Sequence, residues 1–211
     1  MIKVFNFDHS IDEFCANIYI VGKENGPCVI IDYGSTSQKL INYIKIHYSE
    51  VKALLLTHGH FDHIRGLSKF HDYFSKTPIY IDEFDYELLQ NPKLNGSYLT
   101  NESVKINLNV KAFKNLDILN FGDGLKFQVF ETPYHTDGSV CLLNQEENAL
   151  FTGDSLFKGS IGRDDLITSN RNLLKDSLEI IKGFDTKLVV YPGHGFITTI
   201  GEELKNNPYL N

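Results

Sequence analysis

The sequence predicts an α/β (α+β) fold in which two similar halves pack face to face. Strand and helix signals alternate along the chain, and each half contains a continuous apolar run that ends at a histidine, at residues 54–58 and 188–194. No linker-like stretch separates the two halves. We therefore expect residues 1–211 to form a single domain, which is an ordinary size for one domain.

The composition is that of a globular protein, with 42% hydrophobic and 22% charged residues. The net charge is −7 and no basic cluster stands out, so a nucleic-acid partner is not expected. No apolar run approaches about 20 residues, and the N-terminus lacks the apolar core of a signal peptide. We expect no membrane partner and a cytoplasmic location. Cys15, Cys28 and Cys141 stand singly in apolar runs, which predicts buried free thiols.

In the first half, turn-forming residues at 22–27 separate two apolar segments, which predicts a hairpin. The spacing of Leu40, Ile41 and Ile44 predicts a helix, and residues 34–36 offer its cap. A continuous apolar run at 51–57 is typical of a fully buried strand. The expected elements are strands at 3–7, 16–21, 28–33, 51–57 and 79–81, and helices at 40–48, 64–74 and 82–90, the last capped by Asp82.

Residues 91–110 are polar and rich in asparagine, which predicts a long irregular loop with room for a helical part. Such a loop either forms part of an active site or serves only as a spacer, and the sequence leaves both interpretations open. Strand signals then return, with a turn at 122–124. The expected elements are strands between 117 and 132, a hairpin of 139–143 with 149–152, a helix at 171–181, a buried strand at 187–191 and a final helix at 201–207.

Five of the eight histidines stand where strand-like segments end, in turns rich in glycine, proline or threonine. These five are His58, His60, His63, His135 and His194. A lone histidine is most often a satisfied polar residue, and we interpret the other three, His9, His47 and His71, in that way.

The run from His58 to His63 holds three histidines and Asp62. A strand continued through His58 and His60 would place both side chains on one side, where two imidazoles could converge on one cation. Asp62 and His63 follow where the chain should turn into a helix, and would project toward a second cation. This density of metal-binding side chains predicts a metal site.

Three later residues end other strand-like segments in turns that contain proline or glycine. They are His135, Asp154 and His194. Each is weak evidence alone, but all three would lie at one edge of the sheets together with the first run. We therefore include them among the candidate metal ligands.

These motifs resemble those of the metallo-β-lactamase-fold hydrolases, most closely the single-domain, type II glyoxalase-like (hydroxyacylglutathione hydrolase-like) members. The segments that carry the resemblance span nearly the whole chain and are residues 57–64, 132–139, 151–156, 159–163, 191–195 and the tail at 200–210. The resemblance implies a four-layer αββα sandwich and two metal ions. It implies that His58, His60 and His135 hold one metal, that Asp62, His63 and His194 hold the other, and that Asp154 bridges them.

Two residues depart from the family pattern, and a third feature has two readings. Tyr134 stands where relatives usually have glycine, and Asp137 where proline is common. We expect Tyr134 either to narrow the mouth of the site or to pack on the surface. Arg163, in the run 162–165, either holds a loop over the site through charge-assisted hydrogen bonds or belongs to a surface turn.

The predicted activity is that of a metal-dependent hydrolase, in which a hydroxide bound by two metals attacks a carbonyl of a small-molecule substrate. No GxSxG or reactive-cysteine motif offers a protein nucleophile. Asp62 is the candidate catalytic residue, because it could orient the water or accept its proton. Ligands without thiolate suit zinc, iron or manganese, and we expect two divalent ions, with zinc as the metal.

The leading substrate class is a thioester such as a hydroxyacyl-glutathione. Larger type II glyoxalases carry a C-terminal helical domain that helps bind glutathione, and here only residues 195–211 follow His194, so we expect that domain to be absent. Lactones, esters and other thioesters therefore stay open. Within the resemblance, an alternative is a mononuclear iron persulfide dioxygenase that uses His58, His135 and Asp154. A non-catalytic metal-binding module is the third hypothesis, and the complete ligand set disfavours it.

Overall fold

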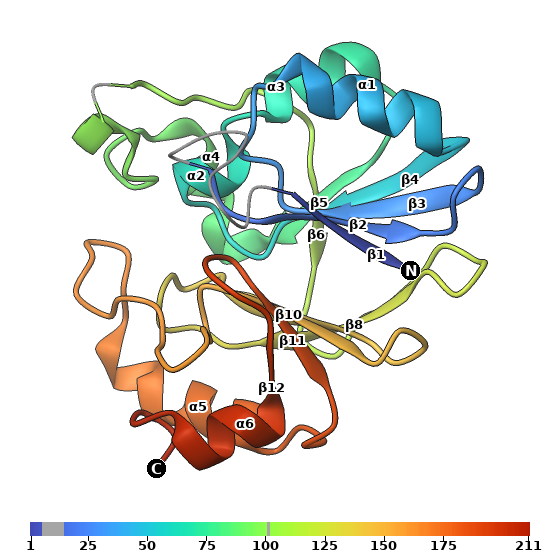
Figure 1. Ribbon diagram of the computed structural model, residues 1–211. Coiled ribbons are helices and arrows are strands. Elements are labelled where there is room, and N and C mark those ends of the chain that lie inside the picture. Colours follow the sequence, from blue (N-terminus) through green and yellow to red (C-terminus); the bar gives the residue numbers. More distant parts are fainter. Residues whose placement is uncertain (6–14, 101) are drawn as a thin grey trace.

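The computed structural model describes residues 1–5, 15–100 and 102–211, and these form two six-stranded sheets. The sheets face each other, and helices cover the outer face of each (Figure 1). This is the four-layer αββα sandwich that the resemblance implied. None of the helices in the described ranges is long and apolar enough to cross a membrane.

The first sheet has the strand order β1-β2-β3-β4-β5-β6, and its last four strands run parallel to one another. The carboxyl ends of parallel strands meet at one edge of a sheet, so the loops that follow β3 and β4 emerge side by side. The elements of this half are β1 (Ile2–Phe5), β2 (Ile18–Gly22), β3 (Pro27–Ile31), α1 (Gln38–His47), β4 (Glu50–Leu55), α2 (Phe61–Ile64), α3 (Leu67–Tyr73), β5 (Ile79–Asp82), η1 (Glu83–Asp85), α4 (Tyr86–Gln90), η2 (Ser97–Thr100) and β6 (Lys111–Phe113).

The second sheet has the order β12-β11-β10-β9-β8-β7, and only its β10–β11 pair is parallel. Its ligand-bearing loops follow β8, β10 and β11. The elements of this half are β7 (Ile118–Asn120), β8 (Lys126–Glu131), β9 (Val140–Asn144), β10 (Ala149–Gly153), η3 (Arg171–Leu173), α5 (Leu174–Lys182), β11 (Val189–Pro192), β12 (Thr198–Thr199) and α6 (Ile200–Asn206).

Three apolar clusters separate the four layers. Side chains of both sheets form the central cluster, in which Val29 and Leu55 of the first sheet meet Phe127 and Phe151 of the second. A second cluster packs α1 and α3 against the first sheet, and a third packs α5 and α6 against the second. Alternate side chains of each strand therefore enter different clusters, as a sheet buried on both faces requires.

Most of the expected elements are present, with shifted ends. The helix expected after residues 34–36 is capped one residue later, by Ser37, whose Oγ accepts the Lys39 amide. The helix expected at 64–74 is divided into α2 and α3, with Gly66 at the start of α3. Strands β6 and β12 were not predicted, because each has two or three residues and exists only through pairing with a neighbouring strand.

The remaining expectations about packing are confirmed where the structure describes them. Cys15, Cys28 and Cys141 are buried and none is in a disulfide, and burial raises the pKa of both Cys28 and Cys141 to about 12. The first strand is present at Ile2–Phe5. The last residues expected in it, 6 and 7, and His9 lie outside the described residues.

We predict that Phe127→Ala destabilises the fold by about 3–5 kcal/mol, because it removes a fully buried ring from between the two sheets. Chemical denaturation followed by circular dichroism would measure the loss. Ile46→Ala, at a position on α1 where the side chain is 72% exposed, is the control and should change the free energy of unfolding by less than about 1 kcal/mol. Equal effects of the two variants would contradict the assignment of the central core.

Candidate metal centre

The histidine run after β4 lies in a loop and a short helix. Residues 56–60 are outside any strand, His60 is the N-cap of α2, and Asp62 and His63 lie within α2. The expectation that a continued strand aligns His58 with His60 is therefore wrong in its geometry, although the two rings do converge. Gly59 makes the loop possible, because a Cβ there would lie 2.8 Å from the Cβ of Leu88 in α4.

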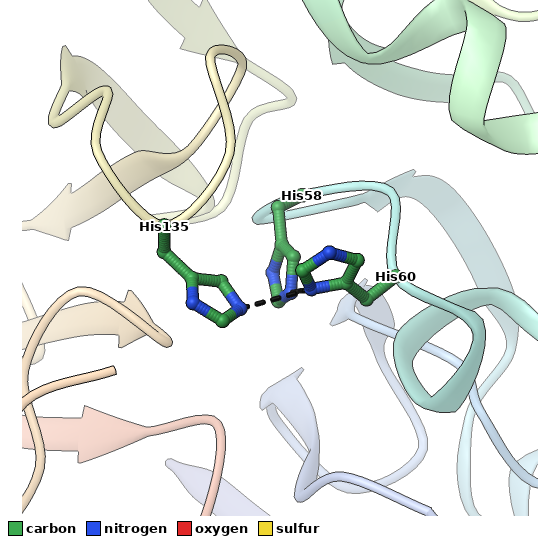
Figure 2. Close-up of side chains that lie close together, drawn as sticks. All are labelled: His58, His60 and His135. Carbon is green, nitrogen blue, oxygen red and sulfur yellow. Dashed lines mark hydrogen bonds between the residues drawn. The ribbon is translucent and has the colours of Figure 1, made fainter. Parts of the chain in front are cut away.

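The first group of side chains is formed by His58, His60 and His135 (Figure 2). His58 Nε2 lies 3.1 Å from His60 Nδ1, which lies 2.9 Å from His135 Nε2. All three side chains are buried, and Figure 2 shows their rings converging from two separate loops. Tetrahedral ligand atoms about 2.0–2.1 Å from a zinc ion lie about 3.4 Å from one another, so this spacing suits one cation.

Hydrogen bonds on the far side of two of these rings select the nitrogen that faces the group. His135 Nδ1 donates to the carbonyl of Arg163 at 2.9 Å, which leaves the Nε2 lone pair directed inward. His60 has the opposite arrangement, because its Nε2 lies 2.9 Å from Thr168 Oγ1 and its Nδ1 faces the group. Such outer contacts fix ring orientation and tautomer at metal sites.

A second group is formed by Asp62, His63 and His194. Asp62 Oδ2 lies 2.9 Å from His194 Nε2 and 3.7 Å from His63 Nε2. His63 Nδ1 donates to Asp32 Oδ2 at 2.8 Å, so its Nε2 is the nitrogen available to the group.

Asp154 lies between the two groups. Its Oδ1 is 3.3 Å from His63 Nε2 in the second group, and its Oδ2 is 3.4 Å from His135 Nε2 in the first. The structure thus brings all seven predicted ligand residues together, and it places Asp154 where a bridging carboxylate would have to be.

Two unsatisfied atoms show that these residues fit cations. His63 Nε2 and Asp154 Oδ1 are buried and lie 3.3 Å apart, and neither has a hydrogen-bond partner among the residues that the structure describes. Buried polar atoms without a partner are uncommon in folded proteins and call for an explanation. A cation between them would satisfy both atoms, so the His/Asp cluster suits a dinuclear site for divalent metals.

Four histidines of the cluster fall into two pairs according to whether their pKa is lowered or raised. Burial, together with the neighbouring His135, lowers the pKa of His60 to about 3, and burial likewise lowers the pKa of His58. Burial also acts to lower the pKa of His63 and His194, but the nearby carboxylates raise it by more, so both values lie above the ordinary one. Burial acts to raise the pKa of Asp154, but the surrounding imidazoles lower it by more, which keeps this carboxyl ionised.

Two buried aspartates that the sequence reasoning missed hold the ligand segments in place. Asp32, at the end of β3, accepts hydrogen bonds from His63, from the Thr57 amide and from Thr57 Oγ1, each at 2.8 Å. Its position directly after a buried apolar strand was a usable signal, because strand ends bear the other site residues. Its left-handed backbone, with φ of 57°, is one that aspartate tolerates.

Asp85 connects the loop after β4 to the loop after β8. Its carboxylate accepts the Gly59 amide at 2.7 Å, the Gly138 amide at 3.0 Å and the Thr136 hydroxyl at 2.8 Å. His58 and His135 are thereby held in register by a residue that is not a ligand. Nothing in the local sequence around Asp85 distinguishes it, so only the folded structure identifies this role.

Tyr134 is fully buried, so neither expectation for it is correct. Its hydroxyl donates to the carbonyl of Ser155 at 2.7 Å and accepts the Gly162 amide at 3.1 Å. It therefore connects the end of β10, which bears Asp154, to the loop that orients His135. Asp137 is exposed, and its Oδ1 accepts a hydrogen bond from Asn170 at 3.3 Å.

Arg163 contributes to the site through its backbone. Its exposed guanidinium donates to Asp165 at 2.8 and 3.1 Å, as expected for a residue of a surface turn. Its carbonyl accepts the hydrogen bond from His135 Nδ1. The other histidines lie apart from the cluster where described: His47 pairs with Glu24 on the surface, and His71 lies on α3.

A cleft of about 510 Å³ opens over the cluster and reaches His60, Asp62, His135 and Asp154. Part of the segment at 91–110 lines it, namely residues 93–96 and 98–100. Of the two readings left open for this segment, the structure therefore supports a place beside the candidate site.

Residues 12–194 match the family described as the metallo-beta-lactamase superfamily. The chain belongs to this superfamily. The hydroxyacylglutathione hydrolase GloC of Haemophilus influenzae is 30% identical, over 95% of each chain. Among solved structures, the B3 metallo-beta-lactamase BLEG-1 is 36% identical and matches with a TM-score of 0.90 over 100% of both chains. TTHA1623, solved in a di-iron-bound form, is 31% identical, with a TM-score of 0.82 over 94% of this chain and 96% of that one.

Superfamily membership and these relatives identify the chain as a metallo-hydrolase at this general level. The predicted resemblance is confirmed. The metal assigned to the cluster and the role of each side chain stay predictions.

We predict that Asp32→Asn weakens metal binding about 10–100-fold, because an amide replaces the carboxylate that accepts the His63 proton. Asparagine also tolerates the left-handed backbone at this position, so the fold should be retained. Competition with a chromophoric chelator would measure the affinity. Asp72→Asn, on an exposed part of α3, is the control, and equal affinities of the two variants would contradict the role of Asp32.

We predict that metal affinity falls as the pH falls through the raised pKa values of His63 and His194. A raised pKa means that the proton stays on the ring at a higher pH, and this proton must leave before the nitrogen can bind a cation. With two such groups, binding should release up to about two protons. Calorimetric titrations in buffers of different ionisation enthalpy would count them. Metal binding without proton release near neutral pH would contradict the assignment.

Proposed function

We propose that this protein is a two-metal hydrolase that cleaves thioesters, with hydroxyacyl-glutathione as the leading substrate class. The observation that carries the proposal is the pair of ligand groups that share Asp154 at the base of one open cleft. The similarity to GloC along nearly the full length of both chains supports the thioester specificity.

Divalent cations bound in the cluster would generate a hydroxide nucleophile at neutral pH and polarise a carbonyl group. The protonation states of several residues in the cluster suit bound cations. His58 and His60 are held neutral by burial, so their lone pairs are available without loss of a proton. Asp154 is held ionised and supplies negative charge to both groups.

Asp62 is proposed as the residue that orients the attacking water and accepts its proton. Its side chain lines the cleft and is 16% exposed, and its pKa is lowered: burial acts to raise the value, but His63 and His194 lower it by more. The water oxygen bonds to the carbonyl carbon, the carbon–sulfur bond breaks, and the departing thiolate takes up a proton. The products are a carboxylic acid and a free thiol.

Zinc is the proposed metal, because a set of imidazoles and carboxylates without thiolate suits it. The same set suits iron and manganese. The di-iron form of TTHA1623 gives iron particular weight among the alternatives. Elemental analysis of protein purified without added metal would decide between them, and two ions per chain would be expected. One iron per chain, with oxygen uptake on a persulfide, would instead favour the dioxygenase.

Hydrolysis of a β-lactam amide is the second candidate activity. The observation that favours it is the similarity to the BLEG-1 metallo-beta-lactamase over the whole of both chains. The same site would serve, because attack on a strained amide also needs an activated water and a polarised carbonyl. Turnover of a chromogenic β-lactam in preference to thioesters would select this activity.

We predict that a panel containing a hydroxyacyl-glutathione, a simple thioester, a lactone and a β-lactam gives fastest turnover with a thioester. Asp154→Ala should lower kcat/KM by about 10³-fold or more, because it removes the carboxylate between both metal positions. Metal content and kcat/KM would be measured on the same preparation. The exposed Asp72→Ala is the matched control.

Two outcomes would count against this reading. Turnover of another substrate class, with none for any thioester, would reject the substrate assignment. Unchanged activity of Asp154→Ala would reject the site itself.

A further inference from the structure

The cleft over the metal centre is bounded by two segments that lie far apart in the sequence. One is residues 93–100, which follow the helices of the first half, and the other is residues 163–168, which follow β10 in the second half. Both segments lie at the same end of the sandwich (Figure 1). A molecule bound in this cleft would therefore contact both halves of the protein.

Four apolar side chains from these two segments line the cleft, and together they are called the apolar wall. They are Tyr98, Leu99, Leu166 and Ile167. Tyr98 is 52% exposed, Leu99 68% and Ile167 63%. Single exposed apolar residues are common on protein surfaces and carry no inference. These are grouped on two sides of one cleft with the candidate ligands at its base, which is the usual pattern of a small-molecule site.

The charged side chains of the two bounding segments are compatible with a site for an apolar group. Arg163 and Asp165 pair with each other through two hydrogen bonds, so their charges largely cancel. Lys93 also lines the cleft and is exposed. The apolar wall therefore offers hydrocarbon contact and no concentrated cationic surface for an anionic group.

We propose that the apolar wall binds the hydrocarbon chain of the acyl group in an acyl thioester. The enzyme then prefers medium-length or aromatic acyl groups over short ones. This inference rests on the proposed thioester hydrolysis and specifies its substrate. The thiol parts of biological thioesters are polar and charged, so the acyl part is the one whose chemistry matches the wall. A carbonyl placed at the ligand cluster leaves the acyl chain within the same cleft.

The kinetic test uses N-acetylcysteamine thioesters of saturated acids from acetyl to octanoyl, which share one small, neutral thiol. Thiol release is followed with a thiol-reactive chromophore on metal-loaded protein. We expect kcat/KM to rise about threefold per methylene until the wall is covered. Leu99→Ser and Ile167→Ser should each lower the octanoyl-to-acetyl ratio of kcat/KM by about fivefold or more. Leu116→Ser, where the side chain is 57% exposed outside the cleft, is the matched control and should leave that ratio unchanged.

A binding measurement tests the wall independently of turnover. Calorimetry should show that octanoate binds more tightly than acetate, and that Leu99→Ser and Ile167→Ser reduce the difference while Leu116→Ser does not. Thioester turnover with a flat chain-length series and equal affinities for acetate and octanoate would overturn the acyl-binding wall and leave the proposed function in place. No turnover of any thioester, with wall-dependent octanoate binding retained, would overturn the proposed function and support a hydrocarbon site.

Discussion

The folded structure depends on holding five imidazoles and two carboxylates together at the base of a cleft, where four of the imidazoles and Asp154 are buried. Unpaired buried charge is costly, so such a cluster persists only if the charges compensate one another or cations enter it. Without metal, the compensation comes from protons, which the carboxylates retain on His63 and His194. His63 Nε2 and Asp154 Oδ1 face each other at 3.3 Å without a hydrogen bond among the described residues, which indicates that this arrangement is incomplete without a cation. The fold therefore creates a cluster in which cations can replace the protons on His63 and His194.

The scaffold around the cluster explains how loops achieve precision normally associated with strands. The segments that bear His58 to His63, His135 and Asp154 are held by hydrogen bonds to groups that are not candidate ligands: Asp32 holds the first run, Asp85 joins the loops after β4 and β8, and Tyr134 joins the end of β10 to the loop beyond it. The contacts of Asp85 cross between the halves of the sandwich, so the relative placement of the two sheets and the geometry of the cluster depend on one another. Positioning of this kind is what a metal site requires of its outer contacts.

The candidate metal ligands and the residues that bound the cleft belong to different segments of the chain. The candidate ligands lie in short loops and in α2 at the adjoining edges of the two sheets, whereas the cleft above them is bounded by longer segments. Such segments tolerate sequence change, because few backbone groups of the sheets depend on them. Proteins named as a hydroxyacylglutathione hydrolase and as a metallo-beta-lactamase are both similar to this chain along nearly its whole length. The substrate of this chain therefore has to be argued from the apolar wall.

The sequence by itself determined the fold class and which residues gather at the site, because buried strands and clustered histidines are local patterns. It did not determine how His58 and His60 converge, since the strand ends at Leu55 and a hydrogen bond to Thr168, remote in sequence, helps select the nitrogen of His60 that faces the group. Strands β6 and β12, the clamp formed by Asp85 and the burial of Tyr134 were likewise decided by tertiary structure. Except for β12, which pairs with the nearby β11, the deciding partner is distant along the chain, and a local pattern contains no information about distant partners.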